Sequence, residues 1–354
     1  MNGSEITVVH VGSACRDIAQ EDPRGWRIGG GVMYAALTTA RLGLRTAAVV
    51  GVDAEAAGAA ELDMLDDAGV DILRVPLPEG PIYHNLETPT GRVQTCVQPG
   101  VPLPIPTLPA AWLAAPGWSV VPVAGEIDDT WAEVVPEGAH VAVAWQGLLR
   151  DLRAGERVRH RPPTPSPILE RADLIGVSRH DVAPDIPLRA LWSLLRPGAD
   201  LLITQGDQGG LLLRLGTDGP DAILRYRSPA SDAETDPTGA GDTYLAALHA
   251  SGLRAAGATG AAGATGAPGP TGARGVSGAT AVAWPERRDA IHDSLDLRFA
   301  AAAGSLVVED WGLAGVPGLA AVEARLDRDQ DPDAVAAIPA EDARAFWPEG
   351  ATIE

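Results

Sequence analysis

Residues 236–243 have the sequence DPTGAGDT, and the apolar run 244–250 that follows them predicts a helix. The glycines at 239 and 241 allow a tight turn that exposes backbone amide groups. Such a turn, followed by the unpaired amides and positive dipole of a helix N-terminus, predicts an anion site. Asp242 stands where a carboxylate can accept a proton from an attacking hydroxyl. A plain glycine-rich turn with a capping aspartate is the alternative interpretation.

Outward from this stretch, short apolar runs alternate with helical patterns, which indicates parallel strands joined by right-handed crossovers. We expect one doubly wound α/β sheet rather than a series of small modules. The expected strands are 6–12, 46–52, 71–75, 119–123, 140–144, 174–177, 201–204 and 211–215, and the expected helices include 32–42, 55–68 and 188–195.

Residues 82–97 interrupt the alternation with two strand-like runs around the turn sequence TPTG at 88–91. This pattern predicts a β-hairpin. Two interpretations remain open, a lid over a site and an ordinary hairpin at the edge of the sheet.

Composition excludes several function classes. The 354-residue chain has a formal net charge of −20, which disfavours nucleic acid and anionic membranes as partners. The chain contains no lysine, so a lysine-dependent Walker phosphate loop is excluded. Cys15 and Cys96 are too few for a disulfide framework. Without a secretory signal or a long apolar span, the sequence predicts a cytoplasmic protein.

The eight-residue context of Asp242 resembles the DTxGAGD motif of the ribokinase/PfkB-like carbohydrate kinases. The resemblance implies a ribokinase-like αβα sandwich with a mostly parallel sheet and a small β lid formed by about 13–28 and 82–98. It also implies that Asp242 is the catalytic base and that the amides of Gly239, Ala240 and Gly241 form the anion hole. Pro237 departs from the family, which usually has threonine there.

Further motifs extend the resemblance to the side that would bind the acceptor. Asp17 follows the first strand where the family places an aspartate that holds acceptor hydroxyls, although a solvated loop carboxylate is the simpler interpretation. Gly30 and Gly31 resemble the family's N-terminal glycine pair. Tyr34 stands where the family usually has asparagine, and together with Gln146 and Arg150 it resembles the inositol-kinase subgroup.

On the side that would bind ATP, the resemblance implies roles for six residues. Thr204 and Gly206 resemble the family's T-x-G element, and Thr238 lies within the motif itself. The segment 297–312 resembles the adenine-pocket segment, which adds Ala301, Gly304 and Gly312 as candidates. Close packing of a helix against its neighbours explains these small residues equally well.

The family's N-x-x-E motif, which organises Mg²⁺ through water, is replaced here by Ser178-Arg179-His180-Asp181. An oxygen donor and a carboxylate remain, and Mg²⁺ keeps several waters and needs few carboxylates. Asp181 and Asp236 are therefore the candidate metal residues. A monovalent cation is a further cofactor that the resemblance allows.

The chain divides into three parts by composition. Residues 1–320 form the predicted kinase domain, and 321–354 form an acidic C-terminal appendage. Residues 254–280 hold a strict G-x-y repeat, with glycine at every third position from 257 to 278. A flexible insert is the favoured interpretation, because ordering such a segment is entropically costly. A collagen-like triple helix is the alternative.

Together these features predict an ATP-dependent kinase that phosphorylates a hydroxyl of a sugar, a polyol such as inositol, or a nucleoside. Two rivals belong to other classes, a ligand-binding or regulatory protein that has lost turnover, and a scaffold trimerised by the repeat. The intact Gly239–Asp242 stretch favours the kinase, whereas Ser178–Asp181 favours the first rival. Pairing of lid strands into a homodimer is left open.

Overall fold

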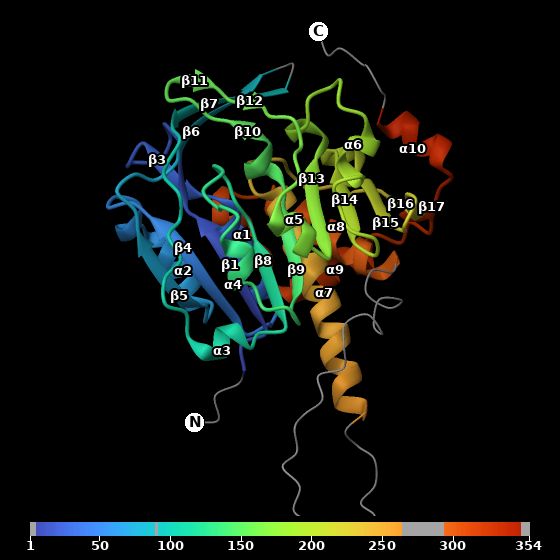
Figure 1. Ribbon diagram of the computed structural model, residues 1–354. Helices are drawn as coiled ribbons and strands as arrows, with labels where there is room; N and C mark the ends of the chain where they lie inside the picture. The colour runs from blue at the N-terminus through green and yellow to red at the C-terminus, as the bar shows by residue number, and fades with distance from the viewer. Residues whose placement is uncertain (1–4, 89–90, 264–293, 348–354) are drawn as a thin grey trace, which may run out of the picture.

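The computed structural model describes residues 5–88, 91–263 and 294–347. A ten-stranded sheet is covered on both faces by helices, and a smaller five-stranded sheet projects from one edge of this sandwich (Figure 1). The architecture is the expected ribokinase-like αβα sandwich with a β lid. In the described ranges, no helix is long and apolar enough to cross a membrane.

The large sheet has the strand order β17-β16-β15-β14-β13-β9-β8-β1-β4-β5. Neighbouring strands from β14 through β13, β9, β8, β1 and β4 to β5 pair in parallel, as the sequence predicts, while β15, β16 and β17 extend the sheet antiparallel. The strands are β1 Val8–Ser13, β4 Thr46–Val52, β5 Asp71–Pro76, β8 Gly117–Val120, β9 His140–Ala144, β13 Leu174–Ser178, β14 Asp200–Thr204, β15 Gly210–Leu215, β16 Pro220–Tyr226 and β17 Val335–Ala337.

The central strands are apolar throughout because both of their faces are buried. In β4, Ala48 and Val50 pack into the core on one face, while Ala47 and Val49 pack into the core on the other. This period of two is what a doubly covered parallel strand requires. The fully buried pattern of β4 explains why its predicted bounds are confirmed.

Two groups of helices cover the two faces. The first core lies beneath α1 Gly31–Arg41, α2 Ala60–Asp67, α7 Ala240–Gly263, α8 Ser294–Val307 and α9 Leu319–Arg328. The second lies beneath α3 Ala110–Leu113, α4 Trp131–Val134, α5 Pro167–Arg171, α6 Leu188–Trp192 and α10 Ala340–Phe346. Helix α7 extends beyond the body of the molecule (Figure 1), and the glycine repeat from 264 onward lies outside the described residues.

The lid is a sheet with the order β11-β7-β6-β2-β3. Its strands are β2 Cys15–Ile18, β3 Trp26–Gly29, β6 Ile82–Thr88, β7 Gly91–Gln98 and β11 Glu156–Arg157. The predicted hairpin is confirmed as β6 and β7, and its parallel pairing with β2 joins it to the segment that carries Asp17. A separate two-stranded ladder, β10 Arg150–Asp151 and β12 Arg159–His160, lies beside it.

Several elements differ from the sequence-based expectation. The expected helix 55–68 begins as α2 only at Ala60, because Ala59 is extended, and the expected helix 188–195 ends at Trp192. Strand β8 covers Gly117–Val120 rather than 119–123, because it pairs with Val8–Val11 of β1 and because Pro122, which lacks an amide proton, cannot extend the ladder. Strand β16 was not predicted, since its exposed residues interrupt the apolar run.

The described part of the C-terminal segment, residues 321–347, packs against the domain. Arg325 of α9 is 3% exposed, β17 forms the outermost strand of the large sheet, and Trp347 is fully buried. The indole N–H of Trp347 donates to the carbonyl of Ile186 at 3.0 Å, and Arg179 stacks on its ring at 4.3 Å.

Three buried histidines come from three elements, His10 from β1, His140 from β9 and His249 from α7. The imidazole Nε2 of His10 is 2.9 Å from the hydroxyl of Thr39, and Nδ1 of His249 is 3.0 Å from the hydroxyl of Ser119. The rings of His249 and His140 lie 5.1 Å apart. Burial, followed by the proximity of His249, lowers the pKa of His10 to about 3. Burial also lowers the pKa of His249, so the fold holds His10 and His249 in their neutral form.

We predict that acid weakens the fold through these histidines. The unfolded chain binds a proton at His10 near pH 6.5, whereas the folded chain does so only near pH 3, so stability is complete above pH 6.5 and falls as the pH drops toward 3. The contribution of His10 to the free energy of unfolding should fall by about 2 kcal/mol between pH 7.5 and pH 5. Urea denaturation of the wild type and His10→Gln at both pH values measures it. Equal pH dependence in the two proteins would contradict the prediction.

Candidate active site

The site forms where the N-termini of α1 and α7 meet at the carboxyl ends of the strands, the place where open α/β sheets collect ligands. Gly30 precedes α1 with a φ of 103°, and a Cβ atom there would lie 2.5 Å from the carbonyl oxygen of Ser13. Gly31 is the first residue of α1, and its Cβ position would lie 2.9 Å from Oδ1 of Asp242. The predicted glycine pair therefore lies against the predicted base.

The turn before α7 exposes amide groups, but of the three predicted amides that of Ala240 donates to the carbonyl of Pro237 at 3.4 Å. Gly239 has a φ of 81°, a left-handed conformation that only glycine adopts readily, and α7 begins at Ala240. Among the described residues, no acceptor pairs with the amides of Gly241 and Asp242. These amides and the helix dipole make a site for negative charge.

Glycines and side chains contact each other reciprocally across the two helix starts. A Cβ at Gly239 would lie 2.3 Å from the ring of Tyr34, just as one at Gly31 would contact Asp242. Gly31 of α1 thus leaves room for Asp242 of α7, and Gly239 before α7 leaves room for Tyr34 of α1. In each case the side chain comes three residues after the glycine of its own helix start. Tyr34 is 1% exposed, so this contact fixes the position of the ring.

Asp242 has an electrostatic environment suited to a base. Burial, followed by the nearby carboxylate of Asp181, raises the pKa of Asp242 to about 7, and the guanidinium of Arg150 offsets part of this rise. A carboxyl group with a pKa near 7 is a stronger base than an ordinary aspartate and is still partly ionised at neutral pH. Asp181, Arg150 and Asp242 thus form the charged centre of the site.

Gln146 and Arg150 lie on the turn after β9 and hold Asp181. The amide Nε2 of Gln146 donates to Asp181 Oδ1 at 2.9 Å, and Nη2 of Arg150 lies 3.9 Å from the same oxygen. Arg150 also donates to the carbonyl of Val123 at 3.1 Å and stacks on Tyr83 at 5.5 Å. Its side chain is 9% exposed, so the positive charge is held in one place.

Ser178 and Asp181 also cap their own turn. The hydroxyl of Ser178 accepts from the amide of His180 at 3.3 Å, and Oδ2 of Asp181 accepts from the amide of Ser178 at 3.3 Å. The second oxygen of Asp181 faces Gln146 and Arg150. Asp236, the other residue predicted to hold metal, contacts Arg27 and the amide of Gly312.

The residues predicted to bind nucleotide fall into separate places. Thr204 ends β14 and Gly206 begins the turn that follows, with open space at its Cβ position. Ala301 is 1% exposed in the core, and a Cβ at Gly304 would lie 3.5 Å from the carbonyl of Ala240. These two small residues allow α8 to pack closely against α7, which is the alternative that the sequence left open.

A cavity of about 200 Å³ lies between the lid and residues 235–238. Asp17, Tyr34, Thr238 and Gly312 are among its lining residues, and the amide of Gly312 donates to Asp236 Oδ2 at 3.1 Å. Asp17 thus lies on a cavity wall, where its predicted role would require it. Thr238 and Gly312, both predicted on the nucleotide side, lie on the wall of this cavity together with Asp17.

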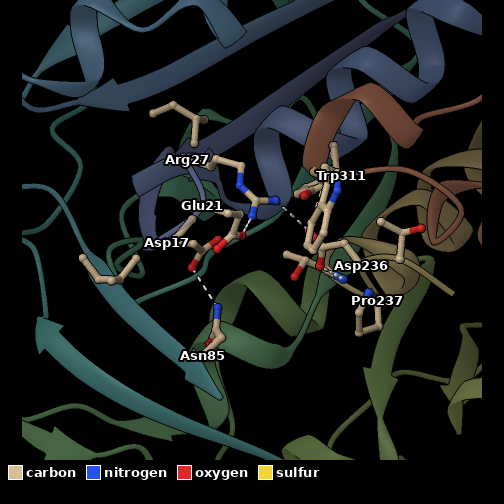
Figure 2. Close-up of a pocket in the computed structure, with 14 residues that line it drawn as sticks. Asp17, Glu21, Arg27, Asn85, Asp236, Pro237 and Trp311 are labelled. Atoms are coloured by element: carbon tan, nitrogen blue, oxygen red, sulfur yellow. Dashed lines mark hydrogen bonds and ion pairs between the residues drawn. The ribbon is translucent and has the colours of Figure 1, made fainter. Parts of the chain in front are cut away.

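Several functional candidates of the lid were not found from the sequence. The side chain of Asn85 donates to Asp17 Oδ1 at 3.0 Å and accepts from Gln94 at 2.6 Å, so the hairpin holds Asp17 (Figure 2). Arg27 and Trp311 stack at 4.5 Å on the opposite wall. A polar residue inside the strand-like run 82–88 was the available signal for Asn85.

We predict that Gly239→Ala destabilises the protein by about 2 kcal/mol, since it places a Cβ against Tyr34 and forces a left-handed alanine. Thermal or urea denaturation measures the loss. In the double variant Gly239→Ala/Tyr34→Ala the clash disappears. Its loss in the free energy of unfolding should therefore be about 1 kcal/mol smaller than the sum of the losses of the two single variants. Strict additivity would contradict the contact.

No protein-family model and no curated protein matches the chain. Solved structures do match. A pyrophosphate-dependent kinase in the ribokinase family, complexed with a pyrophosphate analog and myo-inositol, has 16% identity and a TM-score of 0.58 over 86% of this chain and 96% of its own.

Two further matches have other substrates. The nucleoside kinase of Methanocaldococcus jannaschii, an archaeal member of the ribokinase family, has 14% identity and a TM-score of 0.61 over 92% of this chain and 100% of its own. The ribokinase of Arabidopsis thaliana, complexed with ribose and ATP, has 16% identity and a TM-score of 0.57 over 91% and 99%. The chain has the fold of the ribokinase-family kinases.

Proposed function

We propose that this protein is a cytoplasmic phosphotransferase that moves the γ-phosphoryl group of ATP to a hydroxyl of a sugar, polyol or nucleoside. The observation that carries the proposal is the position of Asp242. Its carboxyl group, with a pKa of about 7, lies at the N-terminus of α7 beside the amides of Gly241 and Asp242. A base and an anion site side by side are what transfer of a phosphoryl group to an alcohol requires.

In the proposed step, the oxygen of the acceptor hydroxyl bonds to the γ-phosphorus while Asp242 takes the proton of that hydroxyl. The bond from that phosphorus to the bridging oxygen breaks, and ADP leaves with the electron pair. The free amides at the start of α7 stabilise the negative charge on the transferred group. Arg150, fixed by Val123 and Tyr83, adds a permanent positive charge beside Asp242 and Asp181.

Magnesium fits the donor set around Asp181. The described residues contain no group of three or more metal-ligating side chains. One carboxylate with water suits Mg²⁺, which binds mainly to phosphates and water. Asp181 supplies that carboxylate beside the base, and a bound Mg²⁺ would neutralise phosphate charge there. Asp236 fits less well, because it is not among the charges that act on Asp242, whereas Asp181 is.

The donor is assigned to the side of Thr204 and Gly206. The open space at Gly206 and the turn after β14 support a nucleotide at this strand end. Pyrophosphate is the alternative donor, as in one of the matching kinases. Both donors place a phosphoryl group at the same amides, so the chemistry assigned to Asp242 is common to them.

We predict that acceptor-stimulated release of ADP depends on Asp242. Asp242→Asn should lower kcat by about 10²–10⁴-fold, because the amide cannot accept the proton. Release of ADP or phosphate is followed with ATP or pyrophosphate, magnesium and a panel of ribose, fructose, myo-inositol and adenosine. Asp218→Asn, in an exposed turn, is the matched control and should keep full activity. Transfer that survives in Asp242→Asn would exclude this residue as the base.

We predict that kcat/KM rises with pH through an apparent pKa of about 7, since Asp242 must be ionised to act as a base. Removing the Asp181 charge with Asp181→Asn should move this rise to lower pH. Removing the Arg150 charge with Arg150→Gln should move it to higher pH. Profiles of kcat/KM against pH for the three proteins test both directions. If the rise stays at one pH in all three, another group controls it.

A binding or regulatory protein without turnover is the second candidate. It is favoured by the capping contacts of Ser178 and Asp181, which use oxygens that a metal would otherwise engage. In that case calorimetry would detect donor binding that Asp242→Asn leaves unchanged, with no acceptor giving transfer.

A further inference from the structure

The cavity beside the lid has an unbalanced charge. Its charged lining groups are the carboxylates of Asp17, Glu21 and Asp236 and the guanidinium of Arg27, so three negative charges and one positive charge give a net charge of −2 (Figure 2). No histidine is among the lining residues, and the chain has no lysine. An acceptor in this cavity therefore meets mostly negative charge.

The single positive charge is already engaged. Arg27 forms an ion pair with Glu21, its Nη1 lies 3.5 Å from Asp236 Oδ2, and its guanidinium stacks on Trp311. Figure 2 shows the guanidinium between Glu21 and Trp311. Its side chain is 18% exposed, so little of it faces a ligand. An anionic acceptor would have to displace one of the two carboxylates to reach this cation.

Tyr34 offers a free polar group to the same cavity. Its side chain is 1% exposed, it lines the cavity, and its hydroxyl makes no hydrogen bond with any described residue. Burial, followed by the charges of Asp236 and Asp17, raises the pKa of this hydroxyl, so it stays protonated. It can donate to a hydroxyl of a bound molecule and accept from another donor. The ring is buried, but the hydroxyl is not one of the fully enclosed atoms that lack a partner, so it is open to the cavity, where a polar ligand can pair with it.

We propose that the acceptor is an amino sugar or amino polyol, which carries a protonated amine beside its hydroxyls and no phosphate or carboxylate. The inference rests on the proposed function, because it names the acceptor class, and the cavity adjoins the start of α7 through Tyr34, whose ring lies against Gly239. The ammonium group lies among the carboxylates of Asp17, Glu21 and Asp236, and a hydroxyl pairs with Tyr34. Charges held at contact distance in a partly enclosed site interact strongly enough to select by charge.

Matched acceptors test this assignment. Glucosamine is compared with glucose, N-acetylglucosamine and glucose 6-phosphate, and an inosamine is compared with myo-inositol. We expect the amines to have a KM at least about tenfold below that of the neutral partner. The phosphate ester should be the poorest acceptor. The preference should vanish as the pH passes the pKa of the amine, because the uncharged amine loses its attraction.

Two charge variants should move the preference in opposite directions. Glu21→Gln reduces the net negative charge of the cavity and should lower the ratio of amine to neutral affinity, and Glu21 is exposed enough for the fold to tolerate the change. Arg27→Gln increases the negative charge and should raise the ratio.

Calorimetry of the same compounds without a phosphoryl donor separates the proposed function from the proposed preference for amines. Amine-selective binding with no transfer to any acceptor would overturn the proposed function, and the amine would then be a ligand of the cavity rather than an acceptor. Equal or tighter binding of neutral or anionic partners would overturn the inference whatever the turnover.

Discussion

The reciprocal contact between the starts of α1 and α7 sets the geometry of the whole site. Gly31 leaves room for Asp242, and Gly239 leaves room for Tyr34, so neither helix can shift without disturbing the other. Interiors are packed closely enough that such contacts transmit small displacements. The anion site, the base and one wall of the cavity are therefore placed by one packing arrangement, with the lid and the β13 turn added around it.

The charges of the site are divided between two regions. Around Asp242, the carboxylate of Asp181 and the guanidinium of Arg150 act in opposite directions on one pKa. Across the cavity, Arg27 is neutralised by Glu21 and Asp236. Both arginines are thus held within the protein, Arg150 by Asp181 and the Val123 carbonyl and Arg27 by Glu21 and Asp236. They differ in that the charge of Arg150 acts on the pKa of Asp242, whereas the charge of Arg27 lies on the wall of the cavity.

The sequence predicted what depends on local pattern. Apolar runs located the parallel strands, and the glycines at 239 and 241 located the turn before α7, since both follow from short-range conformational preference. It could not predict the partners that the fold brings together from afar. Arg27 and Asp236 are 209 residues apart, and Asn85 reaches Asp17 only because β6 pairs with β2. Trp347 and Arg325 belong to a segment whose acidic composition concealed its buried residues.

The contact of Trp347 with Arg179 has a consequence for the order of assembly. A ribosome releases the chain from its N-terminus, so the lid and α1 emerge early, whereas the indole that stacks on Arg179 emerges more than a hundred residues after that arginine. The turn that holds Asp181 cannot reach its final packing until the end of the domain has been synthesised. A nascent chain that already contains Asp242 can therefore form the contacts of Asp181 with Gln146 and Ser178, but Arg179 beside them gains its stacking partner only after α10 has emerged.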